Sequence, residues 1–156
     1  MNFKFHIVLI EPEIPPNTGN IGRLCVATQS TLHLVGPLGF SLEDKALRRA
    51  GLDYWKYVDL KQHPTWEDWL HWRNTNYPQM PFYFFTKKTN QSFYNIRHTS
   101  PAAFIFGKET WGLPQNLIDQ YPDQTFQVPM FSNQVRSLNL SNAVAIVLYE
   151  AVRQQL

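Results

Sequence analysis

The chain has 156 residues and a formal net charge of +2 at pH 7, and 44% of its residues are hydrophobic. This length and composition, which includes 11 Phe, 7 Tyr and 5 Trp, predict one folded domain over residues 1–156 and exclude a disordered chain. The mildly basic charge is compatible with a nucleic-acid partner and does not require one.

Cysteine and histidine usage argues against disulfide and metal chemistry. Cys25 is the only cysteine, and its apolar neighbours predict a small buried side chain. The five histidines are not spaced as metal ligands, so we expect no bound metal. No run approaches the roughly eighteen apolar residues of a membrane span, and the N-terminus lacks the regions of a signal peptide. We therefore expect a cytoplasmic protein that does not contact a membrane.

The N-terminal part predicts a strand, a polar loop and a helix. Residues 5–10 are a continuous apolar run, which is typical of a buried parallel strand. A proline-rich loop leads to a helix predicted over residues 21–28, with Asn17 or Thr18 as its cap. A well-capped helix is the simplest interpretation. The alternative is a ligand site, because α/β proteins bind ligands after strand ends and because Arg23, a cation near the predicted helix start, favours an anionic partner.

The next segment carries a cluster of cations. A second strand is predicted over residues 31–35, followed by a short helix that Ser41 caps, with Asp44 at the capping-box position, and that ends at Gly51. Three cations lie on this helix: Lys45, Arg48 and Arg49. They form either a solvated face or a set of contacts to RNA phosphates.

The middle of the chain is rich in aromatic residues. Tyr54 and Trp55 belong either to the core, which is the more frequent case, or to a surface that stacks on bases. Strands are predicted over residues 57–60, 82–86 and 102–106, and a helix over residues 66–74. This alternation predicts an α/β fold with a mostly parallel sheet and helices on both faces.

The C-terminal part predicts a strand over residues 126–128 and a helix with an apolar stripe over residues 137–155, joined by a polar loop. Polar residues crowd the first turns of this helix: Ser137, Asn139, Ser141 and Asn142. They are either a cap with solvated neighbours or, together with Arg136, donors and acceptors that point into a cleft at the helix N-terminus.

Three motifs follow one another along the chain. They are NTGNIGR at residues 17–23, GKETWGLP at residues 107–114, and VPM at residues 128–130 with RSLNLSNAVAIVLYE at residues 136–150. Together they resemble the SPOUT superfamily of S-adenosylmethionine-dependent RNA methyltransferases. The motif sequences most resemble those of the small bacterial tRNA 2′-O-methyltransferases that act on the wobble nucleotide, and the resemblance extends over residues 7–152.

This resemblance implies a fold, an assembly and a cofactor. It implies a deep trefoil knot in the C-terminal segment, a homodimer that packs the final helix against its mate, and S-adenosyl-L-methionine as cofactor, with S-adenosyl-L-homocysteine as product. The residues that it implies for cofactor binding are Phe84, Thr86, Gly107, Val128, Met130, Ser137, Leu138 and Asn142. The apolar stripe of the final helix suits either the dimer contact or the core of one chain.

The resemblance also implies roles in chemistry and RNA binding. The implied catalytic set is Arg23, Asn17, Glu109, Ser137 and Asn139. A guanidinium pKa lies above about 12. We therefore expect Arg23 to bind phosphate and orient the hydroxyl rather than act as general base, with Glu109 holding Arg23 or Asn17. The residues expected to contact RNA are Lys45, Arg48, Arg49, Lys108 and Arg136.

The implied activity is 2′-O-methylation of the wobble ribose, of cytidine or a modified uridine, in the anticodon stem-loop of tRNA. The alternatives are 2′-O-methylation of ribosomal RNA and a non-catalytic RNA-binding assembly factor. The complete set of polar motif residues argues against the second alternative. An ordinary nucleotide-binding domain is disfavoured, because the chain has no GxGxxG or P-loop pattern.

Overall fold

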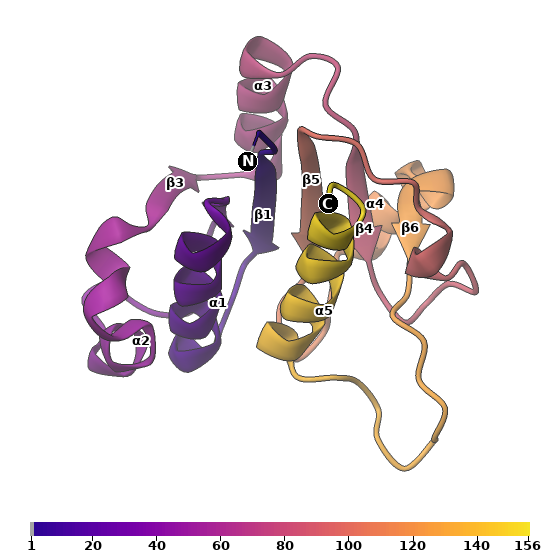
Figure 1. The fold of residues 1–156 in the computed structure, drawn as a ribbon. Helices are drawn as coiled ribbons and strands as arrows, with labels where there is room; N and C mark the ends of the chain where they lie inside the picture. Colours follow the sequence, from indigo (N-terminus) through magenta and orange to yellow (C-terminus); the bar gives the residue numbers. More distant parts are fainter. Residues whose placement is uncertain (1) are drawn as a thin grey trace.

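The computed structural model describes residues 2–156 and is built around one sheet of six parallel strands in the order β3-β2-β1-β5-β4-β6 (Figure 1). The strands are β1 (Phe5–Ile10), β2 (Thr31–Val35), β3 (Asp59–His63), β4 (Phe82–Phe85), β5 (Ala102–Phe106) and β6 (Thr125–Phe126). The predicted α/β class is confirmed, and every strand pair is parallel.

Helices cover both faces of the sheet, as predicted. One face carries α1 (Pro15–Thr28) and α5 (Leu140–Arg153), and the other carries α3 (Trp66–Asn76) and α4 (Gln115–Gln120). The short α2 (Lys45–Gly51) packs against α1. Short 3-10 helices lie in the connections: η1 (Leu52–Tyr57), η2 (Phe93–Asn95) and η3 (Pro122–Gln124).

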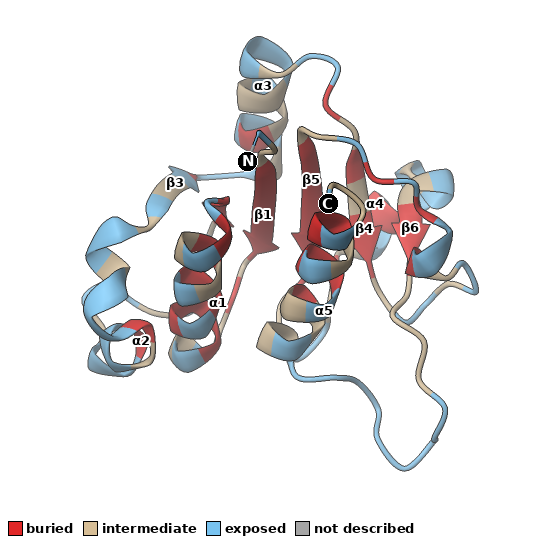
Figure 2. Ribbon diagram, in the orientation of Figure 1, coloured by how far each residue is buried: buried red, intermediate tan, exposed pale blue. Residues whose placement is uncertain are grey.

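The core has two layers, one on each side of the sheet, and the central strands β1 and β5 are buried throughout, whereas the edge strand β3 is only partly buried (Figure 2). Side chains of β1 alternate between these layers. Phe5, Ile7 and Leu9 pack with α1 and α5, and Val8 and Ile10 pack with α3 and α4. Because helices cover both faces, every residue of this strand except His6 is apolar.

Three histidines form a buried chain across β1, β2 and β3. Nδ1 of His6 lies 3.0 Å from Nε2 of His33, and Nδ1 of His33 lies 2.9 Å from Nε2 of His63. Among the described residues, Nε2 of His6 has no hydrogen-bond partner. We therefore place the proton of each neutral ring, His6 and His33, on Nδ1. With this choice the unpaired Nε2 of His6 is an acceptor, whereas the other tautomer would leave it as an unpaired N–H donor. Burial lowers the pKa of His6 to about 4 and that of His33 to about 2, so both rings are neutral near pH 7.

Helix α1 begins before the predicted residues 21–28, because two prolines occupy its first positions. Proline suits the first helical turn, where a backbone N–H has no intrahelical partner. The prediction that Asn17 or Thr18 caps the helix is therefore wrong: both lie in its first turns, and Ile14 is the N-cap residue. Arg23 lies in mid-helix and is exposed, so the argument from a cation at a helix start does not apply to it.

The strand predicted over residues 57–60 is displaced, because η1 precedes β3 here. Trp55 of η1 packs against α1, where a Cβ added at Gly22 would meet its ring at 2.6 Å. The core interpretation is thus correct for Trp55. Tyr54 is 44% exposed, and the guanidinium of Arg23 lies 5.3 Å from the centroid of its ring.

Helix α5 begins at Leu140 rather than at Ser137, and Asn139 is its N-cap. The apolar stripe of this helix is fully buried within the single chain and consists of Val144, Val147, Leu148 and Ala151. Of the two alternatives for this stripe, the core is therefore the correct one. Two larger apolar side chains of α5 face solvent: Ile146 is 39% and Tyr149 is 50% exposed.

Two smaller differences concern the ends of elements. Asp44, rather than Ser41, caps α2, because its carboxylate accepts hydrogen bonds from the backbone N–H groups of Ala46 and Leu47. The strand predicted over residues 126–128 is the two-residue β6, and the chain leaves the sheet after Phe126.

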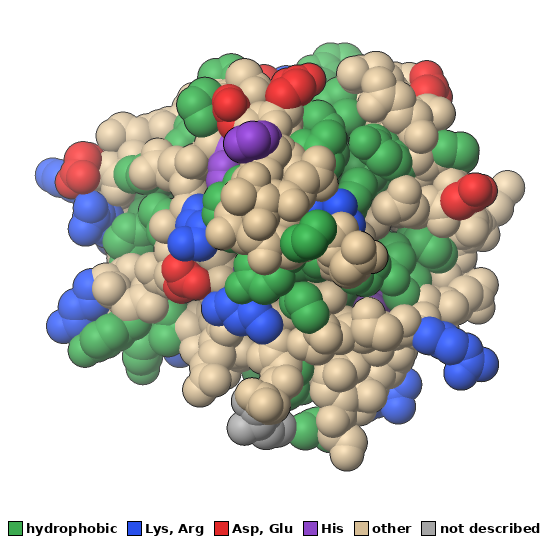
Figure 3. All heavy atoms as spheres, turned by 90° about the horizontal axis from the view of Figure 1, so that it is seen from above, with side chains coloured by type: hydrophobic (Ala, Val, Ile, Leu, Met, Phe, Trp, Pro, Cys, Tyr) green, Lys and Arg blue, Asp and Glu red, His purple; other side chains and the backbone are tan. Residues whose placement is uncertain are grey.

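The end of the molecule at which the strands begin carries charges of both signs, interspersed over the surface (Figure 3). Within residues 2–156, no helix has the length and apolar character needed to cross a membrane. The same residues contain no group of three or more His, Cys, Asp or Glu side chains arranged to hold a metal ion.

Candidate active site

A cavity of about 380 Å³ lies beyond the carboxyl ends of β1, β4, β5 and β6. The chain runs outward from β1 to β3 and then returns to the other side of β1, so the strand order reverses between β1 and β5. Loops diverge at such a point, and open α/β sheets bind ligands there. The cavity is lined by residues 85–88, 106–112 and 137–140 together with Ile14, Asn17, Val128, Met130 and Ala143.

One wall of the cavity is apolar. The rings of Phe85 and Phe106, from neighbouring strands β4 and β5, stack with their centroids 5.0 Å apart. Val128, Leu138 and Ala143 line the cavity as well. A flat apolar wall of this kind suits an aromatic or aliphatic part of a small ligand.

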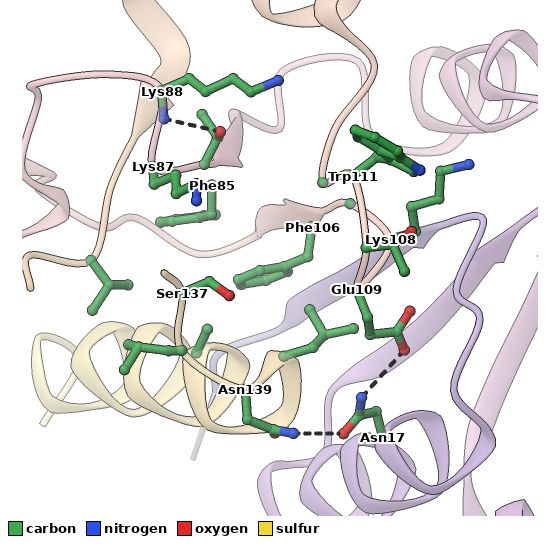
Figure 4. Close-up of a pocket in the computed structure, with 18 of the residues that line it drawn as sticks. Asn17, Phe85, Lys87, Lys88, Phe106, Lys108, Glu109, Trp111, Ser137 and Asn139 are labelled. Atoms are coloured by element: carbon green, nitrogen blue, oxygen red, sulfur yellow. Dashed lines mark hydrogen bonds between the residues drawn. The ribbon is translucent and has the colours of Figure 1, made fainter. Parts of the chain in front are cut away.

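The opposite side holds a chain of polar side chains from three segments (Figure 4). Nδ2 of Asn17 donates to Oε1 of Glu109 at 3.3 Å, and Nδ2 of Asn139 donates to Oδ1 of Asn17 at 3.1 Å. The chain thus joins the loop after β5, the first turn of α1 and the N-cap of α5. It sets the amide orientation of Asn17, because each of its side-chain heteroatoms has a defined partner.

Glu109 also holds the start of α1 in place. Its two oxygens accept hydrogen bonds from the backbone N–H groups of Glu13, at 2.9 Å, and Ile14, at 3.1 Å. Glu13 makes the reciprocal contact, since its carboxylate accepts from the hydroxyl of Thr110 at 2.6 Å and from the backbone N–H of Thr110 at 3.2 Å. These hydrogen bonds lower the pKa of Glu13, and the bond from the Thr110 hydroxyl makes the largest contribution. The two loops therefore clamp each other.

Asn139 completes the arrangement at α5. Its Oδ1 accepts hydrogen bonds from the backbone N–H groups of Ser141, at 2.9 Å, and Asn142, at 3.3 Å, and from the Ser141 hydroxyl at 2.6 Å. The oxygen of this side chain caps the helix while its nitrogen faces Asn17. The two interpretations offered for the polar residues here, a cap and a cleft wall, both hold for Asn139.

Cations surround the cavity. Lys87 and Lys88 follow β4 and line one side, and Lys108 follows β5 on the other (Figure 4). Nζ of Lys87 donates to the backbone carbonyl of Arg136 at 3.0 Å, which ties the loop before α5 to the end of β4. Among residues 2–156, Glu109 is the one acid that lines the cavity, and its oxygens already accept three N–H groups. The lysines therefore give the rim of the cavity a positive charge, which suits an anionic group bound at that rim.

Most of the residues predicted for the site line this one cavity: Asn17, Thr86, Gly107, Lys108, Glu109, Val128, Met130, Ser137, Leu138 and Asn139. Residues that the prediction missed include Phe85, Phe106 and Trp111. Trp111 lies inside the second motif, and its position between two predicted site residues of that motif, Gly107 and Glu109, and the following helix could have indicated that it lines the cavity.

Several predicted residues lie elsewhere. Phe84 is fully buried on the α3 and α4 side of the sheet, because successive side chains of β4 point to opposite faces and Phe85 takes the cavity side. Asn142 lies on α5 beyond the lining residues. Arg23 does not line the cavity either, and Glu109 holds Asn17 rather than Arg23.

The cations of α2 are also outside the cavity. Lys45, Arg48 and Arg49 are exposed, and Arg48 pairs with the carboxylate of Glu43 at 3.2 Å. Arg136 is exposed on the loop before α5. The structure leaves these side chains open to solvent, so both alternatives for the α2 cluster, a solvated face and an RNA contact, remain compatible with their positions.

Comparison with known proteins finds relatives of nearly the same length as this chain. The chain is 50% identical over 151 residues to the tRNA (cytidine(34)-2′-O)-methyltransferase of Acidovorax sp. (strain JS42), covering 96% of this chain and 91% of the relative. It is 48% identical to the enzyme of the same name from Methylovorus glucosotrophus (strain SIP3-4), covering 96% and 95%.

Solved structures of methyltransferases also match this chain over nearly its whole length. A structure described as giving insights into the 2-OH methylation of C/U34 on tRNA matches with a TM-score of 0.91 and 38% identity, covering 98% of this chain and 97% of the other. The SpoU methyltransferase AviRb from Streptomyces viridochromogenes, solved with the cofactor AdoMet, matches with a TM-score of 0.84 and 25% identity, covering 99% and 62%. The model of the SpoU rRNA methylase family matches residues 4–149, and the chain belongs to this family.

Proposed function

We propose that this protein transfers a methyl group from S-adenosyl-L-methionine to the 2′-hydroxyl of the wobble ribose of tRNA. The proposal rests on the cavity where the strand order reverses between β1 and β5. One wall of this cavity is apolar, and the hydrogen-bonded side chains of Glu109, Asn17 and Asn139 border the other. Relatives of nearly equal length with 48% and 50% identity bear the name of this activity for cytidine(34). A modified uridine at the same position is included in the proposal.

The cavity has the chemistry that this cofactor requires. Its volume of about 380 Å³ falls in the range of small-molecule sites, roughly 300–1,000 Å³. Phe106, Val128 and Leu138 would pack against the adenine and the methylene groups, and Thr86 and Met130 lie beside them on the lining. Gly107 allows the backbone of Gly112 to pack directly against it at the cavity wall, since a Cβ there would lie 2.0 Å from the carbonyl carbon of Gly112. When bound, the cofactor supplies a methyl group on a sulfonium, and loses it to become S-adenosyl-L-homocysteine.

The side chains at the polar wall position the ribose. Asn17 and Asn139 each use one amide N–H within the chain and retain a second for the substrate. The hydroxyl of Ser137 lines the same space. Holding the 2′-oxygen in line with the methyl group contributes several orders of magnitude to such a reaction.

The proton of the 2′-hydroxyl leaves as the oxygen–carbon bond forms and the carbon–sulfur bond breaks. Glu109 is a positioning residue rather than the base, because three N–H groups already occupy its oxygens. A phosphate oxygen of the RNA or a water molecule accepts the proton late in the reaction. Arg23 and the exposed cations of α2 bind RNA phosphates outside the cavity, and Lys108 and Arg136 do so at its edge.

The experiment that tests the proposal uses labelled S-adenosyl-L-methionine and tRNA that lacks the wobble 2′-O-methyl group, followed by nuclease mapping of the label. Label at the wobble ribose supports the proposal. Label in ribosomal RNA but not in tRNA would show that the substrate is ribosomal RNA, while the type of reaction would stay as proposed. Cofactor binding without transfer to either RNA would contradict the proposed catalysis and favour a non-catalytic RNA-binding protein.

The proposal includes a homodimer that uses the exposed face of α5. Ile146 and Tyr149 lie one turn apart on this helix, and both expose apolar surface that the single chain leaves uncovered. We expect Ile146→Glu with Tyr149→Glu to convert a dimer into a monomer in analytical ultracentrifugation, because two carboxylates from each chain would be buried against those of the other. Glu67→Ala, on the exposed surface of α3, is the control. A wild-type monomer at micromolar concentration would contradict the dimer.

The proposal also includes a trefoil knot formed by the segment after β6. This segment passes close to the chain before η2, where Gln127 bonds to Gln91 at 2.8 Å and to Phe93 at 2.9 Å, and then continues to α5. When the termini are pulled apart in an optical trap, a knotted chain must end shorter than the full contour length of about 3.3–3.6 Å per residue. An extension that reaches the full contour length would contradict the knot.

A further inference from the structure

Trp111 is the largest exposed apolar side chain at the mouth of the cavity. It lines the cavity and yet is 79% exposed, and it projects from the turn between β5 and α4 together with Lys108 (Figure 4). A lone exposed apolar residue is ordinary on a protein surface. What distinguishes Trp111 is the rigidity of the turn that carries it and the charge of the surface beside it.

The turn around Trp111 is held on both sides. The backbone N–H of Gly112 donates to the carbonyl of Lys108 at 2.8 Å, and Gly112 has a φ of 72°, which favours glycine. Thr110 is bound through its hydroxyl and its backbone to the carboxylate of Glu13. Glu109 is bound to the start of α1. The indole is therefore presented to solvent by a fixed backbone, and a ligand that stacks on it pays little to order the loop.

The charges at the cavity, with Lys108 on the same loop as the indole and Lys87 and Lys88 on the opposite side, indicate the class of ligand. Lys87, Lys88 and Lys108 line the cavity, whereas the two nearby carboxylates, of Glu109 and Glu13, are engaged in hydrogen bonds to the protein. A planar apolar ring at a cavity lined by lysines that form no salt bridge within residues 2–156 matches single-stranded nucleic acid, in which each base lies beside a phosphate. A protein segment would not in general offer this alternation of flat rings and anions.

We propose that Trp111 is a stacking platform for a base of the RNA loop that carries the target ribose, with the three lysines binding the adjoining phosphates. This inference rests on the proposed function and deepens it, because it assigns how the anticodon loop is held open at the cavity. A base that stacks outside the cavity leaves its neighbour's ribose free to enter toward Asn17 and Asn139.

The test is a binding cycle between the protein and an unmodified anticodon stem-loop, read by direct RNA binding and by KM. Trp111→Ala is expected to weaken binding by about 5- to 150-fold, which corresponds to the loss of one base stack. Trp111→Phe should recover most of this loss, because it keeps a flat ring. Tyr94→Ala, which removes a 61% exposed ring from η2 outside the cavity lining, is the matched control and should bind as the wild type does.

Abasic substitutions at each loop nucleotide in turn identify the stacked base. One abasic site should weaken wild-type binding by the same factor as Trp111→Ala and should cause no further loss in that variant. Additive losses at every position would overturn the inference. So would a fall in cofactor affinity, which would place the cofactor on the indole, or a change of oligomeric state in Trp111→Ala, which would make Trp111 a subunit contact.

A separate readout keeps this inference distinct from the proposed function. If the wild-type protein neither binds nor methylates anticodon stem-loops, the proposed function fails, and tryptophan fluorescence then tests the stacking alone. Single-stranded RNA should quench wild-type fluorescence more than that of Trp111→Phe, and inorganic polyphosphate should quench the two equally. Equal quenching by RNA would overturn the inference.

Discussion

Replacement of Glu109 by alanine is expected to lower kcat for methyl transfer by about 100-fold, with cofactor affinity changed by less than about threefold. The carboxylate aligns Asn17 and the first turn of α1 against the N-cap of α5, and a shift of about 1 Å in a positioning group costs roughly 10²-fold in rate. The measurement is single-turnover methyl transfer at saturating tRNA, with the cofactor affinity determined by calorimetry.

Glu109→Gln separates positioning from proton transfer. The amide oxygen can still accept from Ile14 or Asn17, so we expect this variant to recover part of the lost rate with an unchanged pH profile. Glu67→Ala, which removes an exposed acid from α3, should leave the rate unchanged. If Glu109→Gln is as slow as Glu109→Ala and the acid limb of the pH profile disappears, Glu109 is the base and the positioning role is contradicted.

Acidification from pH 6.5 to 4.5 is expected to lower the free energy of unfolding by about 5 kcal/mol through His6 and His33 alone. The pKa of each ring is lowered in the folded chain, to about 4 and about 2, so between these values and 6.5 the unfolded chain binds protons that the folded chain does not. Their contribution is therefore present above pH 6.5 and is lost as the pH falls. Each neutral buried ring contributes a slope of about 1.4 kcal/mol per pH unit. Denaturant unfolding at a series of pH values measures this slope.

The loss is large compared with the total stability of a domain, which is typically about 5–15 kcal/mol. Burial also lowers the pKa of His63 and of His98, and both steepen the same slope. His71→Gln is the control, because it removes an exposed histidine of α3 that lies outside the buried histidine chain. A free energy of unfolding that stays constant between pH 6.5 and 4.5 would show that the histidine chain is protonated in the folded state.

The local sequence pattern predicted the fold class, and most of the residues predicted for the site line the cavity. Apolar runs alternating with helical periodicity predicted the parallel sheet, because strands covered on both faces have few other sequence forms. The three motifs placed Asn17, Glu109 and Asn139 in loops at strand ends, and parallel strands bring such loops to one edge. Their convergence on one cavity could therefore be expected before the structure was known.

Which side chains contact one another depends on how distant segments pack, and this could not be predicted from local pattern. The strand containing Phe84 and Phe85 is buried on both faces, so its sequence has no alternation to reveal that Phe85 takes the cavity side. The partner of Glu109 was open between Arg23 and Asn17, because that choice depends on where α1 starts, and two prolines moved the start back by more than a turn.

The histidine chain shows the same limit most clearly. His6, His33 and His63 are separated by about thirty residues each in the sequence, and nothing in their spacing connects them. The parallel register of β1, β2 and β3 places them on one face, and α3 removes them from water. The family, the sheet and the motif loops follow from residue type and order, so they can be predicted from the amino-acid sequence. The direction in which each side chain points, the clamp between the two loops and the pKa values of the histidines depend on packing between segments that are distant in the sequence, so they require the folded structure.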